Sequence, residues 1–326
     1  MTEGENFITR VKRAWGKKTE TGKDVKEEPP VSNNGLVEEF VVSNRKYEEV
    51  SRDLRLPENC FSPNSRVLSV GEGLSGFASK LKQEGIEIVA LDPIYSMGRE
   101  LFGKSIPDTE KIIQNRYKGR VKFVDYRFEK IASDQPEEPL IAGSVHSMPF
   151  PDDTFTHVFG HRIFEHVDLS EVLPEMVRVL KKGGEIRLGG VMLSALAEEK
   201  KLLAGMYQYD GLSGGLHFES AKGMMEAFLA LSRNKDLKMY VILDGLPHRS
   251  EVRETGSYIA GVIVIRKDNE IPKYTSFSEE ERKQYYNVKT AQEDPCLGRI
   301  YEVNFSNFKK GYYEMIPAGD PEGKFE

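Results

Sequence analysis

The sequence predicts an α/β fold built on a doubly wound, mostly parallel sheet with helices on both faces. The stretch from Arg66 to Tyr95 carries the first observation, because an apolar run ends in glycines, a short helix follows, and a second apolar run ends on Asp92. This pattern is typical of a β-α-β unit. The second observation is that apolar strands and helical patterns continue to alternate through the middle of the chain, which favours a parallel sheet.

The glycine turn and Asp92 together predict a site for an adenosine-type ligand. Glycines at Gly71, Gly73 and Gly76 let backbone N–H groups approach a ligand, and the helix that follows offers a field that favours negative charge. Asp92 lies 21 residues after Gly71, where a carboxylate can accept hydrogen bonds from a ribose diol. The spacing G-x-G-x-x-G also occurs in dinucleotide-binding proteins. A glycine turn that merely closes an α/β crossover is the structural alternative.

Each further element is predicted from its own pattern. Apolar residues between Leu36 and Leu56 indicate one or two helices, which in many α/β domains cover the ligand pocket. Ser75 is a good cap for the first helix of the unit. The remaining elements are an insertion within 94–135, strands at Pro139–Gly143, Thr154–Phe159, Glu185–Val191, Met239–Leu243 and Tyr258–Ile265, a loop at Met206–Ser220 and a helix at Ala221–Leu231.

One further helix is expected to begin at Ser170 and to end at Gly183 and Gly184. Lys181 and Lys182 would lie near its C-terminus, where positive charge suits the helix dipole.

Composition limits the class of protein. Of the 326 residues, 39% are hydrophobic and 30% charged, and no apolar run approaches the roughly 20 residues of a membrane span. Without a signal-peptide core, a cytoplasmic location is expected. The two cysteines, Cys60 and Cys296, form neither a metal cluster nor a disulfide framework. The net charge of −6 argues against broad nucleic-acid binding.

The ends of the chain differ from its middle. Residues 1–35 are charged and poor in apolar groups, so we expect a mostly disordered tail. Within it, residues 6–18 place Phe7, Ile8, Val11 and Trp15 at helical spacing among basic residues. Such a segment suits an anionic membrane surface or a partner protein, and the alternative is a tail that packs loosely. Residues 268–326 are rich in tyrosine and phenylalanine, which indicates a packed extension.

Three passages carry a resemblance to a known family. They are VLSVGEGLSG with Asp92, GSVHSMPFPDDTFTHVFGHRIFEHV, and VLKKGGEIRL leading into a strand. Together they resemble the class I S-adenosylmethionine-dependent methyltransferases of the broad small-molecule type. The match is clear from Arg66 to Val191 and weaker to Ile265. The third passage favours a methyltransferase over a nicotinamide-dependent dehydrogenase.

The resemblance implies a Rossmann-like, seven-stranded sheet, a methyltransferase domain over residues 36–267, and S-adenosylmethionine at the switch point of the sheet. It implies direct methyl transfer to an acceptor nucleophile. It also assigns residues: Gly71, Glu72 and Gly73 to the methionyl end, Asp92 to the ribose, Pro93 and Ile94 to the adenine face, Ser144 and Val145 to the adenine edge, and His161 to the side facing cofactor and substrate.

The sequence departs from the family pattern at two positions. Ser69 stands where an acidic residue usually precedes the first glycine, and Ser144 where an acid usually meets the adenine amino group. A neutral acceptor makes a hydrogen bond weaker than a carboxylate does, by roughly a factor of two. Glu72 could replace part of the missing charge, or its side chain could point to water.

Histidines supply the candidates for a general base. His161 ends the fourth strand beside the inferred pocket, and His217 in the loop Met206–Ser220 is the reserve candidate. That loop is expected to be a mobile lid, with a rigid surface connection as the alternative. His157, His161 and His166 with Glu165 do not show tight ligand spacing, so no metal site is expected.

Three functions are therefore considered. The first is methyl transfer from S-adenosylmethionine to a small or medium-sized acceptor oxygen, nitrogen or carbon. The second is an NAD(P)-dependent oxidoreductase that shares the glycine spacing. The third is a catalytically silent binding protein with a methyltransferase fold, for which Ser69 and Ser144 are the motive.

Overall fold

The computed structural model describes residues 40–42, 46–73, 75–93, 95, 105, 108, 111–112, 121–123, 140–161, 163, 167–198, 201–210, 215–242, 258–275, 300–305 and 314–318. The tail at 1–35, with its segment 6–18, and Ile94 lie outside the described residues. Within the described part of the chain, no helix is long and apolar enough to cross a membrane.

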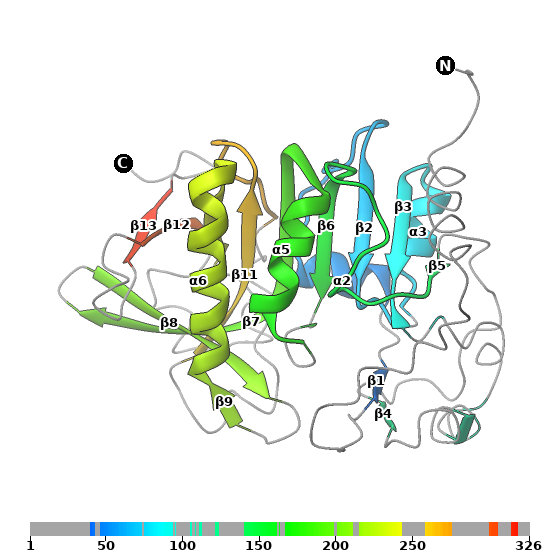
Figure 1. Ribbon diagram of the computed structural model, residues 1–326, viewed down its shortest axis with the longest axis horizontal. Coiled ribbons are helices and arrows are strands. Elements are labelled where there is room, and N and C mark those ends of the chain that lie inside the picture. The colour runs from blue at the N-terminus through cyan, green and yellow to red at the C-terminus, as the bar shows by residue number, and fades with distance from the viewer. Residues whose placement is uncertain are drawn as a thin grey trace.

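One mixed sheet organises the described residues (Figure 1). Its first seven strands run in the order β5-β3-β2-β6-β7-β11-β10. The first five pair in parallel, β11 is antiparallel to β7, and β10 is antiparallel to β11. Their bounds are β2 Arg66–Val70, β3 Glu87–Leu91, β5 Leu140–Ile141, β6 Phe155–His161, β7 Leu180–Glu198, β10 Lys238–Ile242 and β11 Tyr258–Arg266. The predicted doubly wound, mostly parallel sheet is confirmed.

This strand order fixes where a ligand can bind. The chain runs outward from β2 through β3 to β5, and then returns to place β6 on the other side of β2. The switch point therefore lies between β2 and β6, and ligands of open α/β sheets bind outside the carboxyl ends of the strands at such a point.

Further strands extend the sheet beyond β10. Strands β12 Ile300–Asn304 and β13 Glu314–Pro317 come from the aromatic-rich C-terminal segment. Strand β12 pairs antiparallel with β10, and β13 pairs antiparallel with β12. Strands β8 Lys201–Asp210 and β9 Gly215–His217 follow in the strand order. A separate two-stranded sheet joins β1 Phe40–Val42 to β4 Val121–Phe123.

Helices cover both faces of the sheet (Figure 1). Helices α5 Leu169–Val179 and α6 Phe218–Lys235 pack on one face, and α2 Tyr47–Asp53 and α3 Phe77–Gln83 on the other. Alternate strand residues point to opposite faces, so Leu68 and Val70 contribute to the α5/α6 core whereas Val67 contributes to the α2/α3 core.

Arg178 holds the predicted proline-marked turn against α5. Its guanidinium donates to the carbonyl oxygens of Phe150 at 2.7 Å and Met148 at 3.0 Å. Glu175, one turn earlier on α5, pairs with Arg178 and accepts a hydrogen bond from the Met148 N–H at 2.8 Å. The turn therefore leads into β6 at a fixed position.

The C-terminus of α5 differs from the prediction. The helix spans Leu169–Val179, and β7 begins directly at Leu180, so Lys181 and Lys182 lie in a strand. The cation at the helix end is instead the buried Lys267, whose ammonium donates to the Leu180 carbonyl at 2.6 Å. Lys181 and Lys182 were the wrong prediction, because the lysine at this helix end comes from the residue just after β11, far away in the sequence.

The predicted loop at Met206–Ser220 is also wrong. Strand β8 extends to Asp210 and pairs antiparallel with β7, β9 pairs with β8, and α6 already begins at Phe218. Composition suggested a loop because the stretch is rich in glycine, but ladder pairing with β7 and β9 overrides that preference. His217, the reserve base, ends β9, and its side chain lies outside the described part of the chain.

Candidate functional site

The glycine turn after β2 requires glycine at two of its three positions. Gly71 and Gly73 have φ values of +65° and +62°, a region that other residues enter at a cost. A Cβ atom at Gly71 would also lie 2.5 Å from Cγ2 of Ile163. Gly76, in contrast, has a φ of −85°, is the N-cap of α3, and has open space around it. The helix cap predicted at Ser75 is therefore one residue too early, although the Ser75 hydroxyl accepts a hydrogen bond from the Phe77 N–H at 3.3 Å.

Asp92 is in direct contact with this turn. Its Oδ2 accepts a hydrogen bond from the Gly73 N–H at 2.9 Å, and the Gly71 N–H donates to the Leu91 carbonyl at the end of β3, also at 2.9 Å. The Asp92 N–H donates to Ile141 of β5 at 3.2 Å. The acid, the turn and the end of β5 thus meet at one edge of the sheet.

Glu72 is buried, which answers the question that the sequence left open. Its side chain turns under the first residues of α3, where Oε1 accepts hydrogen bonds from the Ala78 N–H at 2.7 Å and the Ser75 hydroxyl at 3.0 Å. Within the described residues, Oε2 makes no hydrogen bond of ordinary length and angle.

Burial raises the pKa of the Glu72 carboxyl to about 7. Hydrogen bonds from Ala78 and from the Ser69 and Ser75 hydroxyls oppose this change, and the negative charge of Asp92 adds to it. Ser69 therefore stabilises the charged form of Glu72 through a hydrogen bond, although Ser69 carries no charge itself.

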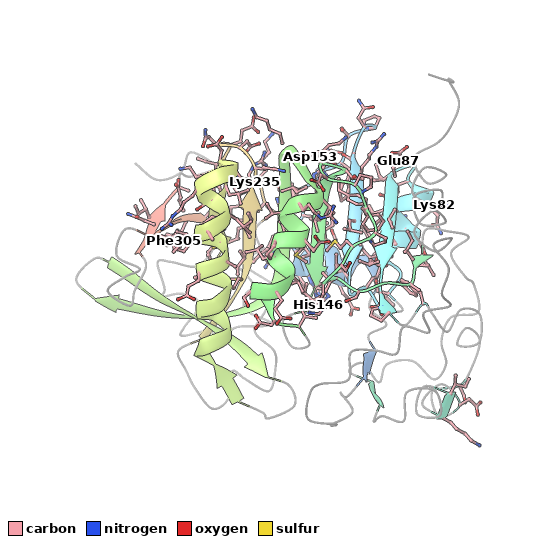
Figure 2. All side chains as sticks on the ribbon, viewed as in Figure 1. Lys82, Glu87, His146, Asp153, Lys235 and Phe305 are labelled. Carbon is pink, nitrogen blue, oxygen red and sulfur yellow. The ribbon has the colours of Figure 1, made fainter. Side chains whose placement is uncertain are left out.

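Ser144 and Val145 lie just beyond β5 on the same edge. Figure 2 shows their neighbour His146 at the end of the sheet opposite to Asp153, which precedes β6. The Ser144 hydroxyl is bonded within its own loop, to His146 Nδ1 at 3.0 Å and to the His146 N–H at 3.2 Å. Val145 is buried, and Pro93 is exposed beside Asp92. The structure therefore brings these residues near Asp92, while Ile94 lies outside the described residues.

His161 ends β6 and is hydrogen-bonded to an acid that sequence reasoning missed. Its Nε2 lies 2.8 Å from Oδ2 of Asp53, the last residue of α2. Both side chains are largely buried, with 11% and 15% of their surfaces exposed. The only signal in the sequence was the predicted covering helix at Leu36–Leu56, which did not single out Asp53.

A buried guanidinium fixes the end of α2 on the sheet. Arg187 of β7 is 1% exposed and donates to the carbonyl oxygens of Leu54 at 3.2 Å and Arg55 at 2.7 Å. It also donates to Lys273 and pairs with Glu185. A Cβ atom at Gly189 would lie 3.1 Å from the Asp53 carbonyl oxygen, so this glycine lets α2 approach β7 closely.

Burial shifts the pKa values of two other titratable residues considered in the sequence, His157 and Cys60. His157 is packed against Phe61 and Phe159, and burial lowers its pKa to about 4. Burial raises the pKa of the Cys60 thiol to about 12. His166 and Glu165 lie outside the described residues, and no three His, Cys, Asp or Glu side chains within the described ranges are grouped as a metal would need.

Strand order, glycine turn and acid together define a Rossmann-like domain of the class I methyltransferase type. Residues 68–188 match the family model described as a methyltransferase domain, and this segment belongs to that family. The resemblance that the sequence carried is therefore confirmed.

Named relatives match short parts of the chain. A demethylmenaquinone methyltransferase of Lysinibacillus sphaericus is 39% identical over 75 residues, which are 21% of this chain and 32% of that protein. An uncharacterized methyltransferase of Mycobacterium bovis is 23% identical over 123 residues, 38% of each chain. The chain thus spans about a third of the length of the curated relatives it matches.

Solved structures match more of the chain but only loosely. A methyltransferase from Methanosarcina mazei is 17% identical, with 65% of this chain and 97% of that one covered and a TM-score of 0.34. For geranyl diphosphate C-methyltransferase from Streptomyces coelicolor the identity is 13%, the shares are 68% and 79%, and the TM-score is 0.37. Because these scores are low, the fold assignment rests on the strand order of this chain.

Proposed function

We propose that this protein transfers a methyl group from S-adenosylmethionine to a small or medium-sized acceptor. The observation that carries the proposal is the hydrogen bond between Asp92 and the Gly73 N–H. It joins the acid and the glycine turn at the switch point of a domain that matches the methyltransferase family.

The residues present fit this cofactor. Gly71 and Gly73 carry no side chains of their own, so the methionyl end would meet the backbone of the turn beside the side chain of Ile163. Asp92 would accept hydrogen bonds from the ribose hydroxyls, and the buried carboxylate of Glu72 would favour the positive charges of the cofactor. Pro93, Ile94, Ser144 and Val145 would surround the adenine.

The bound cofactor supplies an activated methyl group, so the protein has mainly to position the acceptor in line with it. The family resemblance puts His161 on the acceptor side, where an imidazole can take a proton from the acceptor. Ser144, the residue expected at the adenine edge, contributes a hydroxyl and not a carboxylate, so cofactor affinity should be modest.

Calorimetry with S-adenosylmethionine, S-adenosylhomocysteine and NAD, run side by side, tests the proposal. We expect the protein to bind S-adenosylmethionine and S-adenosylhomocysteine but not NAD. NAD binding alone would indicate the oxidoreductase, and no binding of any of the three would indicate the silent binding protein. Transfer of a labelled methyl group to a panel of acceptors follows, with demethylmenaquinone as one member because one relative bears its name.

We further propose a cytoplasmic location and a weak peripheral membrane contact through residues 6–18. The apolar residues of this segment alternate with lysines and arginines that suit anionic headgroups. Sedimentation with vesicles of phosphatidylserine and phosphatidylcholine tests the contact. Equal partitioning of the full chain and of a chain that starts at Gly35 would refute it.

A further inference from the structure

Asp53 and His161 form a pair across two elements that are 108 residues apart in the sequence. His161 stands at the carboxyl end of β6, and Asp53 at the last position of α2. At 2.8 Å, the contact between Nε2 and Oδ2 has the length of a charge-assisted hydrogen bond. The pair is largely removed from water, with 11% and 15% of the two side chains exposed.

The Asp53 side of the pair is held rigidly. Arg187 binds the carbonyl oxygens of the two residues that follow Asp53, and Gly189 lies against the Asp53 backbone. Gly189 is also the residue of β7 that pairs with His161. The acid, the histidine and the strand beneath them are therefore fixed relative to one another, as a preorganised site requires.

The His161 side of the pair adjoins the glycine turn. Gly160, the preceding residue, pairs with Val70, the residue before Gly71. Two residues after His161, Ile163 lies over the turn, because its Cγ2 occupies the space of a Cβ at Gly71. His161 thus stands at the end of β6, beside the turn after β2 that is assigned to the cofactor.

We propose that Asp53 is a positioning residue that holds His161 as the general base of the reaction. The inference rests on the proposed methyl transfer. A neutral imidazole that donates Nε2–H to Asp53 has its basic lone pair on Nδ1. The geometry therefore points to an acceptor that must lose a proton, and an acidic hydroxyl of a phenol or enol suits an imidazole base.

The step balances without a further reactant. The acceptor oxygen forms a bond to the methyl carbon while the bond from that carbon to sulfur breaks, and the electron pair of the broken bond stays on sulfur. The hydroxyl proton passes to Nδ1 of His161. The imidazolium that results is paired with the Asp53 carboxylate, and the guanidinium of Arg187 lies on the same face of the sheet.

Ring NMR of the full chain labelled with ¹⁵N-histidine tests the pair without any acceptor. A His161→Gln variant assigns the His161 signals among the six histidines. In the wild type at pH 8 we expect a proton on Nε2 and none on Nδ1. In Asp53→Asn the titration midpoint of His161 should fall, because a neighbouring negative charge favours the imidazolium. A proton on Nδ1 in the wild type, or an unmoved midpoint, would overturn the proposal.

Two further variants guard against a purely structural effect. Glu48→Gln removes an exposed carboxylate from the same helix and should leave the His161 midpoint unchanged. Asp53→Glu keeps a carboxylate within reach of His161, so its His161 midpoint should lie close to that of the wild type. If Asp53→Asn unfolds, Asp53→Glu still tests the proposal. A His161 midpoint in Asp53→Glu equal to that of free histidine would show that the carboxylate does not act on His161.

Labelled methyl transfer to catechol tests the acceptor class. Wild type and Glu48→Gln should transfer at equal rates, and Asp53→Asn should lose at least about tenfold in turnover while its cofactor Kd changes by less than about twofold. Its pH profile should move to lower pH with the midpoint of His161. Transfer only to N,N-dimethylethanolamine, whose neutral amine form reacts without losing a proton, would overturn this class. No transfer to catechol by a wild type that binds the cofactor would overturn it as well.

The two proposals fail in distinguishable ways. Loss of the methyltransferase assignment would appear as absent S-adenosylmethionine binding in calorimetry, whatever the NMR shows. Failure of the present inference would appear as normal cofactor binding together with an unmoved His161 midpoint in Asp53→Asn.

Discussion

The carboxylate of Asp92 accepts a hydrogen bond from the Gly73 N–H at 2.9 Å, so the end of β3 and the turn after β2 are joined before a ligand arrives. One side chain therefore has two tasks. It keeps the turn in shape, and it offers a charged acceptor at the switch point of the sheet. A substitution at Asp92 should affect both.

Asp92→Ala is expected to weaken S-adenosylmethionine binding by about 1.5–3 kcal/mol, the cost of a lost hydrogen bond to a charged group. Calorimetry measures the affinity, and thermal unfolding measures any separate loss from the turn. Glu84→Ala is the matched control, because Glu84 is an exposed acid just after α3. Equal affinity of Asp92→Ala and wild type would contradict the assignment of the ribose site.

Glu72 gives stability a pH dependence whose sign can be stated. In the unfolded chain its pKa takes the ordinary value of 4.5, and in the folded protein it is about 7. The folded state therefore holds the proton more tightly, so the contribution is full below pH 4.5 and is lost as pH rises to 7. His157, with a pKa lowered to about 4, contributes an opposite slope as pH falls below 6.5.

Glu72→Gln removes the first slope and keeps the second. Between pH 4.5 and 7, the free energy of unfolding of the wild type should fall relative to that of Glu72→Gln by on the order of 3 kcal/mol. Urea unfolding of both chains across this range measures the difference, in which the His157 contribution cancels. Parallel curves for the two chains would show that folding does not raise the pKa of Glu72.

Lys267→Met should destabilise the fold by about 1–3 kcal/mol, because it leaves buried carbonyl oxygens at the end of α5 without a donor. The ammonium serves Leu180 at 2.6 Å and Val177 at 3.4 Å. Its contact with the exposed Asp153 adds little. Lys182→Met is the control, since Lys182 is exposed on β7. Equal urea midpoints for the two variants would show that the Lys267 contact does not stabilise the end of α5.

Local sequence patterns were sufficient to predict the part of the fold that carries the candidate site. The apolar run, the glycines and the acid from Arg66 to Asp92 are each read within a few residues, and the structure joins them as expected. The strands at β10 and β11 were also predicted within one residue, because short apolar runs between polar segments are strong signals.

Contacts between residues that are far apart in the chain could not be predicted from the sequence. Asp53 meets His161 across 108 residues, and Arg187 reaches Leu54 across 133. In the sequence, an aspartate at a helix end and an arginine in a strand resemble ordinary surface residues. Only the folded structure shows the partners that make them buried. The same holds for Lys267, which replaces the two lysines that a local dipole argument selected.

The G-x-G-x-x-G spacing suggested three equivalent glycines, and the structure separates them. Gly71 has positive φ and no room for a Cβ, whereas Gly76 has neither restriction. Gly71→Ala should therefore cost about 1–2 kcal/mol from the left-handed backbone alone, and more from the contact with Ile163 at 2.5 Å. Gly76→Ala should fold with wild-type stability, because a Cβ at this position meets no other atom. Its affinity for S-adenosylmethionine should stay within about twofold of wild type, a change well below the factor of about five that corresponds to 1 kcal/mol. Thermal unfolding and calorimetry on both variants decide. Equal loss of binding in the two would show that the third glycine also meets the ligand, as the dinucleotide spacing would require.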